Sequence, residues 1–249
     1  MSVLQSVGYR HSPSSINGFV DTPQKELAYR LFNIRSPQND NMVRGLCVEA
    51  ATRFIIHRDP TTPELRKYVE RKWEQLKGVD PKYLQWCSDC AALMAKELEQ
   101  RQLKRLKKFQ EPFYGTQGSF QCYGLADFTF NDVTVDIKAP SSMPPYNIPK
   151  TNWIRQQSFY WGLSGKKRRF AILFATNKKC EYYEITQKEL AEGWEIMKSN
   201  MAWIERIDNL CETKQDWINM FPFPDTNSFY YNDENFKQKI TKLLKGEQK

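Results

Sequence analysis

Two aspartates and a lysine stand in one short segment of this chain at a spacing that could do chemistry. Polar and apolar side chains alternate almost without a break from Asp127 to Lys138, around the polar pair Asn131-Asp132. This alternation is typical of a half-buried β-hairpin with a short turn. In that register Asp127 lies directly across from Asp136, and Lys138 follows two residues later on the same face.

The two faces of the predicted hairpin differ in character. The face expected to pack on the core takes Phe128, Phe130, Val133, Val135 and Ile137, and the polar face takes Asp127, Thr129, Thr134, Asp136 and Lys138. Directly opposed side chains in a hairpin have Cβ atoms about 5 Å apart, so two carboxylates there repel each other. The pair therefore needs a partner that offsets the repulsion.

A divalent cation would be such a partner. Mg²⁺ prefers oxygen ligands, commonly one or two carboxylates together with waters and phosphate oxygens. Asp127 and Asp136 would bind it, and the backbone carbonyl of Ile137 could add a further ligand. Lys138 would then hold a water nucleophile or stabilise charge that develops on a phosphate. The alternative is an ordinary exposed hairpin whose lysine neutralises two aspartates.

The composition describes a globular protein with an excess of positive charge. The chain has 249 residues, of which 40% are hydrophobic and 27% are charged, which is enough for one substantial core. The net charge is +8, with basic clusters at 101–108 and 166–169. These clusters favour a polyanionic partner, although a basic run is also typical of a solvated helix face or loop.

Several kinds of site are disfavoured by the residues available. Cys87 and Cys90 form the one C-x-x-C among six dispersed cysteines, with no second pair or nearby histidine to complete a zinc site. His11 and His57 are too few for a histidine-rich metal centre. Neither an apolar run of membrane-spanning length nor a signal-peptide pattern occurs, so we expect a cytoplasmic protein without a membrane partner, in the host cytoplasm if a phage encodes it.

Apolar periodicity and turn residues predict an α+β chain. Helices are expected at 41–57, 61–77, 81–109, 151–163, 187–210 and 234–244, and strands at 111–121, in the hairpin, at 170–176 and at 181–185. Residues 1–40 are predicted as an irregular arm with one short helix near 24–32. Residues 41–249 are predicted as a single domain, with a helical insertion at about 61–109 and a C-terminal helical extension at about 187–249.

Four short motifs resemble those of a nuclease superfamily. Gly124-Leu125-Ala126-Asp127 followed by Asp136-Ile137-Lys138 resembles the G-x-x-D and D-x-K elements of the PD-(D/E)XK nucleases. The segment from Gly45 to Glu49 resembles the G-x-x-x-E element of the RecB-like and lambda-exonuclease-like branch, which includes phage-type exonucleases. The segment from Gln156 to Tyr160 is similar to the Q-x-x-x-Y element of that branch. The four elements occur in the expected order.

Some of these matches also have an ordinary structural explanation. Glu49 could be a surface partner of Arg53, one helical turn later. Gln157 and Trp161 have the same spacing as the Q-x-x-x-Y pair, so the residues alone do not separate the two choices. The chain also departs from the family pattern, because Ala126 stands where the superfamily has proline.

The resemblance implies a fold and a cofactor. The fold would be a central mixed β-sheet flanked by helices, a restriction-endonuclease-like core with a helical insertion. The cofactor would be Mg²⁺ or Mn²⁺, supporting phosphodiester hydrolysis. No iron–sulfur cluster is expected, because Cys211 is the one cysteine after Cys180, whereas cluster-bearing relatives place three cysteines in the C-terminal tail.

The resemblance also implies roles for individual residues. The metal would be bound by Asp127, Asp136 and the Ile137 carbonyl, with Glu49 binding or orienting a second ion or its water. Lys138 would help to activate the attacking water. The substrate would be met by Gln156 and Tyr160, and its phosphate backbone by Lys166, Lys167 and Arg168, with little sequence specificity.

The leading hypothesis is therefore a metal-dependent DNA nuclease, in its favoured form an exonuclease that acts on DNA ends in recombination, repair or phage DNA processing. One alternative is a structure-specific or restriction-type endonuclease. Another is a non-catalytic nucleic-acid-binding protein. The residues leave open the polarity, the strand preference, and whether the chain forms a homo-oligomer or acts with a single-strand-annealing or recombination partner.

Overall fold

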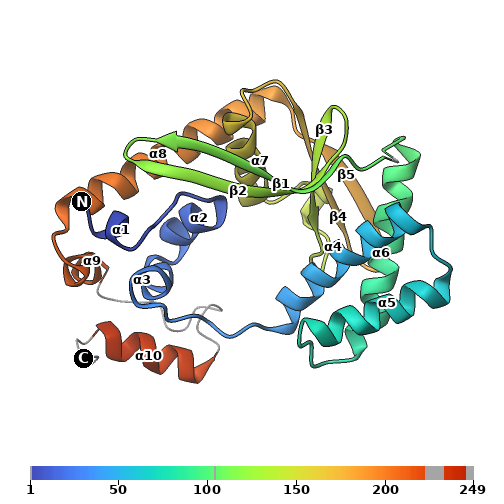
Figure 1. The fold of residues 1–249 in the computed structure, drawn as a ribbon, viewed down its shortest axis with the longest axis horizontal. Helices are drawn as coiled ribbons and strands as arrows, with labels where there is room; N and C mark the ends of the chain where they lie inside the picture. Colours follow the sequence, from blue (N-terminus) through green and yellow to red (C-terminus); the bar gives the residue numbers. More distant parts are fainter. Residues whose placement is uncertain (1, 104, 222–232, 245–249) are drawn as a thin grey trace. The chain divides into compact units, whose positions relative to one another are not determined.

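A computed structural model describes residues 2–103, 105–221 and 233–244 of the chain (Figure 1). The chain groups into two units. The terminal unit comprises Met1–Pro37, Phe113–Gly124 and Glu192–Lys249, and the site unit comprises Gln38–Pro112 and Leu125–Ala191. This grouping differs from the predicted partition into 1–40 and 41–249, because two later segments group with the N-terminal residues.

The terminal unit is mainly helical. Its helices are α1 (Val3–Ser6), α2 (Pro13–Asp21), α3 (Pro23–Phe32), most of α8 (Gln187–Leu210), α9 (Lys214–Met220) and α10 (Glu234–Leu244). Phe236 and Ile240 of α10 share a buried apolar cluster with Ala28 of α3 and Ile218 of α9. The predicted helices at 187–210 and 234–244 are confirmed, whereas α9 is an addition to the predicted elements.

The segment 1–40, predicted as an irregular arm with one short helix, instead holds α1, α2 and α3. The hydroxyl of Ser12 caps α2 by accepting the N–H of Ser15 at 3.2 Å, and Pro13 takes the first helical position. Pro23 begins α3 in the same way. Proline favours the first turn of a helix because it has no N–H bond to lose there. The Ser-Pro and Thr-Pro steps therefore begin helices in this chain, although they also fit a loop.

A five-stranded sheet of order β1-β2-β3-β4-β5 carries the predicted hairpin. Its strands are β1 (Lys108–Gln117), β2 (Phe120–Thr129), β3 (Val133–Lys138), β4 (Arg169–Ala175) and β5 (Cys180–Glu184). The β2–β3 and β4–β5 pairs are antiparallel and the β3–β4 pair is parallel. The chain is thus α+β with a central mixed sheet, as predicted.

Three helices cover one face of this sheet in the site unit: α4 (Asp40–Arg58), α5 (Thr62–Gln75) and α6 (Lys82–Gln100). α6 contacts β4 and β5, and α4 and α5 pack against α6. The five hairpin residues predicted to face the core are buried in one cluster with apolar side chains of these helices. The predicted start of α5 is confirmed, because the N–H of Thr61 donates to Glu64 Oε2 at 2.8 Å in a capping box.

The helix predicted over 81–109 ends at Gln100 instead. Gln102 has a left-handed backbone conformation with φ 61°, which ends the helix. Leu103, Leu106 and Phe109 then pack against the same buried cluster from non-helical backbone and the start of β1. Their apolar spacing resembles that of a helix, but the chain has already turned towards the sheet.

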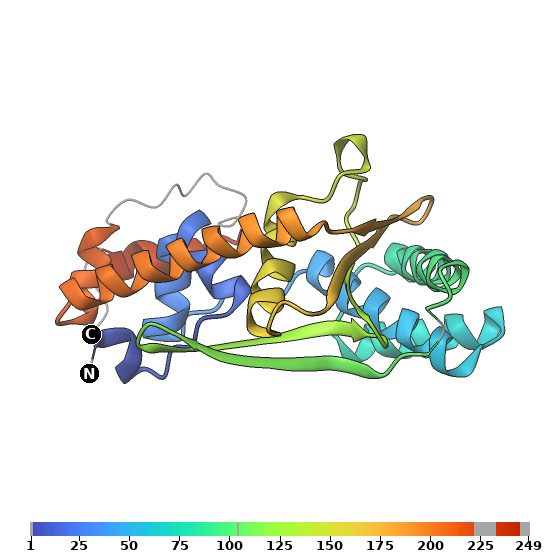
Figure 2. The same ribbon diagram turned by 90° about the horizontal axis from the view of Figure 1, so that it is seen from above.

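α7 (Thr151–Leu163) packs against β4 on the opposite face. The ring of Trp153 on α7 lies 5.9 Å from the ring of Phe174 on β4. The loop from Ala139 to Lys150, which includes the short 3₁₀ turn η1 (Pro145–Asn147), joins β3 to α7 and is coloured olive in Figure 2. Because β3 and β4 are parallel, α7 is the crossover helix between them.

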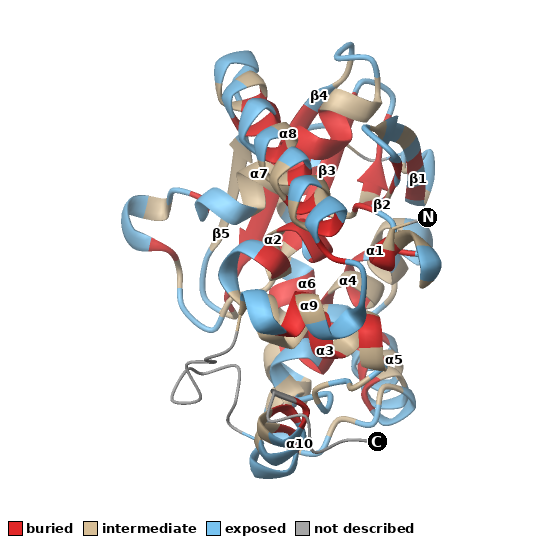
Figure 3. Cartoon of the chain, turned by 90° about the vertical axis from the view of Figure 1, so that its left-hand side faces the viewer, coloured by how far each residue is buried: buried red, intermediate tan, exposed pale blue. Residues whose placement is uncertain are grey.

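β3 is buried on both faces rather than half-buried as predicted. Thr134 and Asp136, on the polar side, are 0% exposed, and Figure 3 colours β3 as buried. The strand lies between β2 and β4, with helices over both faces. The polar face is therefore not a solvated surface, which removes the ordinary explanation for its charges.

None of the helices within the described ranges combines the length and the apolar character that a membrane span needs.

We expect Phe128→Ala to lower the free energy of unfolding by about 3–5 kcal/mol, because Phe128 is fully buried where the hairpin meets α4 to α6. Urea denaturation followed by circular dichroism would measure the change. The matched control is Phe54→Ala, whose ring is only partly buried and stacks on Tyr68. Equal losses for the two variants would contradict the assignment of Phe128 to the centre of this core.

Candidate active site

The β2–β3 hairpin brings two carboxylates together inside the sheet. Phe128 pairs with Val135, and this register puts Asp127 opposite Asp136, which confirms the predicted pairing. The N–H of Ile137 donates to Asp127 Oδ2 at 2.8 Å. Asp136 is fully buried. The hairpin alone thus fixes both carboxylates, one of them through a backbone hydrogen bond.

Lys138 and α7 join these carboxylates in one network. Lys138 Nζ lies 2.6 Å from Asp136 Oδ2 and donates to Gln156 Oε1 at 3.0 Å. Gln156 Nε2 donates to Asp136 Oδ1 at 3.0 Å and to Tyr160 Oη at 3.2 Å. The Tyr160 hydroxyl donates to the carbonyl of Leu125 on β2 at 2.8 Å. Residues from β2, β3 and α7 therefore hold one another in place.

Both glutamines of α7 lie close to Asp136. Gln156 makes the hydrogen bonds described above, and Tyr160 stands one helical turn later on the same side. The amide of Gln157 is near enough to lower the pKa of Asp136, although it makes no hydrogen bond of good geometry with the described residues. The spacing of the sequence left the choice between the two glutamines open, and the hydrogen bonds favour Gln156.

Burial makes the charges of this network costly. Burial raises the pKa of Asp127 well above its ordinary value, and Asp136 adds to the shift, whereas Lys138 opposes it. Burial likewise raises the pKa of Asp136, again against Lys138. For Lys138, burial favours the neutral amine, but the attraction of Asp136 and Asp127 outweighs it and raises the pKa. Burial therefore opposes ionisation of both carboxyl groups, whereas their attraction favours the charged form of Lys138.

Glu49 lies at the edge of this network. Burial raises its pKa, and Asp136 and Lys138 act on it with opposite signs. Its Oε1 accepts a hydrogen bond from Gln110 Nε2 at 3.4 Å. Arg53, the partner considered from spacing, lies with its guanidinium 4.1 Å from the ring of a neighbouring phenylalanine. Glu49 is thus near enough to Asp136 and Lys138 for their charges to act on it, and among the described residues it makes no hydrogen bond to either aspartate.

The donor set fits a divalent cation held by few protein oxygens. Asp127, Asp136 and Glu49 together exceed the charge of Lys138 by two when all are ionised. Asp136 Oδ2 is buried and has no hydrogen bond of good geometry within the described residues, although the ammonium is 2.6 Å away. Those residues also hold no cluster of three or more His, Cys, Asp or Glu side chains arranged to bind a metal. Asp127, Asp136 and Glu49 therefore do not form a three-carboxylate metal site in the described part of the chain.

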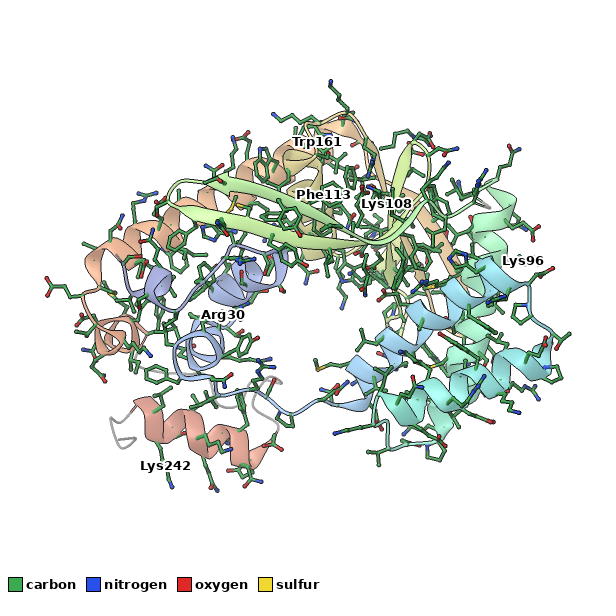
Figure 4. The ribbon with its side chains drawn as sticks, in the orientation of Figure 1. Arg30, Lys96, Lys108, Phe113, Trp161 and Lys242 are labelled. Atoms are coloured by element: carbon green, nitrogen blue, oxygen red, sulfur yellow. The ribbon has the colours of Figure 1, made fainter. Side chains whose placement is uncertain are left out.

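One residue of the basic turn before β4 reaches the same face of the sheet. Arg168 bonds through Nη1 to Glu111 Oε2 and lies 3.4 Å from Thr134 Oγ1. Lys108, labelled in Figure 4, donates to Glu111 Oε1 at 2.8 Å. Thr134 precedes Asp136 by two residues on β3, so Arg168 lies over the same face of the sheet as Asp136, further along the strand.

The two lysines of that turn are placed differently. Lys166 and Lys167 are both exposed. Lys166 Nζ lies 5.3 Å from the ring of Trp161 on α7. Neither lysine contacts the carboxylate network among the described residues. The structure thus places Arg168, but not the two lysines, on the strand face that carries Asp136, in contact with Glu111 and Thr134.

Sequence analysis missed a second group of residues beside the network. Arg44, Lys150 and Trp153 line a cavity of about 400 Å³ together with Lys138. The available signal was Lys150, a basic residue directly before the first helical position of α7. Another cavity, of about 420 Å³, lies between α4, α5 and α6 among mainly apolar side chains and contains no residue of the carboxylate network.

Comparison with solved structures finds this fold elsewhere. A proposed exonuclease from Eubacterium rectale is similar over 83% of this chain and 84% of its own, with a TM-score of 0.60 and 14% identity. LHK-Exo in complex with dAMP matches over 82% of this chain and 91% of its own, with a TM-score of 0.45 and 12% identity. No protein-family model and no curated protein matches the chain. At 14% identity, the first likeness shows a shared fold.

We expect Asp127→Asn to stabilise the fold by an amount on the order of 1 kcal/mol at neutral pH. The folded-state pKa of Asp127 lies above the unfolded value, so its ionisation reduces stability as pH rises from the ordinary carboxyl range to the raised pKa. Asparagine removes that ionisation and can still accept the Ile137 N–H. Denaturant unfolding at a series of pH values would show a flatter profile for the variant. Destabilisation at pH 7 would contradict the electrostatic assignment.

Proposed function

We propose that the chain is a metal-dependent DNA nuclease whose active centre is the carboxylate network of the site unit. The observation that carries this proposal is the opposed pair Asp127 and Asp136. Asp136 is fully buried and contacts Lys138 and Gln156, and Asp127 accepts the N–H of Ile137. Such a pair is costly for the fold, so a purely structural role gives no reason for it. The shared fold with a proposed exonuclease supports the same conclusion.

Asp127 and Asp136, with the carbonyl of Ile137, would hold Mg²⁺ or Mn²⁺, and Glu49 would bind or orient a second ion or its water. When bound, the ion supplies polarisation of the scissile phosphate and a water of lowered pKa. Lys138 would orient the attacking water and stabilise negative charge on the phosphate. Gln156 would keep the Lys138 ammonium and Asp136 at a fixed separation through its two hydrogen bonds.

DNA is the proposed substrate because the protein carries a net positive charge and because basic residues lie near the site. The net charge of +8 favours a polyanion, and Glu111 holds Arg168 over the sheet face that carries Asp136. Exposed Lys166 and Lys167 would add contacts to the phosphate backbone, which carry no sequence information. Tyr160 would hold Gln156 towards the substrate. Action at DNA ends is supported by the likeness to the proposed exonuclease.

We expect Asp136→Asn and Lys138→Gln each to lower kcat for DNA cleavage by at least about 100-fold, because each removes a group that acts on the reacting phosphate. End-labelled linear duplex and closed circular DNA would be incubated with Mg²⁺, Mn²⁺ or EDTA. Loss of linear DNA alone indicates an exonuclease, and loss of both indicates an endonuclease. Salt-sensitive binding without cleavage in any metal would mean a non-catalytic binding protein.

Matched controls come from the same elements. Asp132→Asn changes an aspartate at the turn of the same hairpin, where its side chain is 61% exposed and paired with Arg169. Lys178→Gln changes an exposed lysine in the β4–β5 turn. Both should cleave like the unchanged protein. Full activity of Asp136→Asn or Lys138→Gln would overturn the site.

We expect Gln156→Leu to lower kcat about tenfold and Tyr160→Phe only a few-fold. Leucine removes the hydrogen bonds that the Gln156 amide makes to Lys138 and to Asp136. Phenylalanine removes only the hydroxyl that links Gln156 to β2. Steady-state kinetics on linear DNA would measure both effects. The control is Tyr183→Phe. It removes a hydroxyl on β5 that donates to Glu189 of α8, outside the carboxylate network. A larger effect for Tyr160→Phe than for Gln156→Leu would contradict this order of contacts.

A further inference from the structure

A cavity of about 400 Å³ opens where β3 ends. It is lined by the start of α4, by the loop that follows β3 and by the start of α7, all within the site unit. Three of its lining residues are basic, namely Arg44, Lys138 and Lys150, and Ser141 and Ser142 add hydroxyls. No aspartate or glutamate lines it among the described residues. The charged side chains that line the cavity are therefore all basic, although Lys138 also pairs with Asp136.

Arg44 is the most unusual of these residues. It is only 6% exposed, and its guanidinium stacks 4.5 Å from the ring of Trp86 and 5.4 Å from that of Tyr83. Nη2 makes one long hydrogen bond, of 3.4 Å, to the carbonyl of Ala139. Nε is buried without a partner in the described part of the chain, where no acidic side chain pairs with Arg44. Buried charges are normally paired, and among the described residues Arg44 contacts two aromatic rings and one carbonyl but no anion.

The chain direction adds to the positive character of the cavity. β3 and β4 are parallel, so α7 must start near the carboxyl end of β3, the end at which such units bind their ligands. The 13 residues of α7 begin after Lys150, whose side chain makes no capping hydrogen bond. A helix start with free N–H groups attracts anions, phosphate above all. Arg44 and the start of α7 thus line the same cavity.

We propose that this cavity binds a phosphate group of the substrate strand, next to the phosphate that is cleaved. The inference rests on the proposed function for the identity of the strand, because Lys138 belongs to both the cavity and the carboxylate network. Arg44 and Lys150 are the binding residues, and Trp153 forms the apolar wall. The phosphate is either a terminal monoester at a DNA end or an internal diester, and both offer the same oxygens to the cavity.

The test measures binding without cleavage. Fluorescence anisotropy in EDTA would follow a short labelled duplex that carries a 5′-phosphate, a 3′-phosphate or only hydroxyl ends. We expect Arg44→Gln and Lys150→Gln each to weaken binding by about tenfold. Each should also reduce the slope of log affinity against log salt by about one, because one phosphate contact is lost. A purely structural defect would leave this slope unchanged.

Two controls match the charge that is removed. Arg66→Gln and Lys67→Gln change exposed residues of α5, outside the cavity, and should leave the affinity and the slope unchanged. Lys150 is itself exposed, so Lys150→Gln decides the outcome if Arg44→Gln does not fold. Unchanged affinity and slope in Lys150→Gln, together with unchanged binding by folded Arg44→Gln, would overturn the site.

The three duplexes identify the source of the phosphate. If loss of one terminal phosphate abolishes the dependence on Arg44, the cavity binds that terminal monoester. If the dependence is equal for all three, it binds an internal diester. The Asp136→Asn variant, which should not cleave DNA, allows phosphate binding to be measured independently of the proposed nuclease activity. If no metal supports cleavage but binding still depends on Arg44 and Lys150, the nuclease proposal fails while the phosphate site stands.

Discussion

The opposition of Asp127 and Asp136 inside the sheet is the constraint on which the rest of the site unit depends. Carboxylates at directly opposed positions repel each other, and burial raises the pKa of both. Lys138 offsets part of this cost through its 2.6 Å contact with Asp136. Gln156 then fixes Lys138, and Tyr160 fixes Gln156 to β2. Each of these contacts gives a hydrogen-bond or charge partner to a polar group that is removed from water.

The hairpin can hold such a pair because its other face is a strong core. Phe128 and Val135, which alternate with the aspartates, are fully buried against α4 to α6. A shift of one residue in register would exchange the two faces. The turn prevents this shift, since the N–H of Phe130 donates to the carbonyl of Val133 at 2.9 Å. Hydrophobic burial on one face therefore stabilises the strands that keep like charges together on the other.

The parallel pairing of β3 with β4 decides what surrounds this pair. A parallel connection needs a crossover, so the chain leaves β3 through a proline-containing loop and returns through α7. α7 thereby brings Gln156 over the carboxylates and its own start to the end of β3. Lys138, the last residue of β3, lines the cavity there and also contacts Asp136. Strand direction thus explains why the basic cavity and the acidic pair are neighbours.

The sequence by itself determined the hairpin, its register and most helices, because alternation and helical spacing are local properties of Asp127 to Lys138, of 151–163 and of 187–210. It also supplied Asp127, Asp136, Lys138 and Glu49 as candidates. Only the tertiary structure decided that Thr134 and Asp136 of the polar face are buried, that Gln156 rather than Gln157 makes the hydrogen bonds, and that Arg44 has no acidic partner within the described ranges. The tertiary structure was also needed to show that prolines begin α2 and α3 and that α6 ends at Gln100. The reason is physical: burial and pairing depend on segments far apart in the chain, and residue spacing cannot report on them.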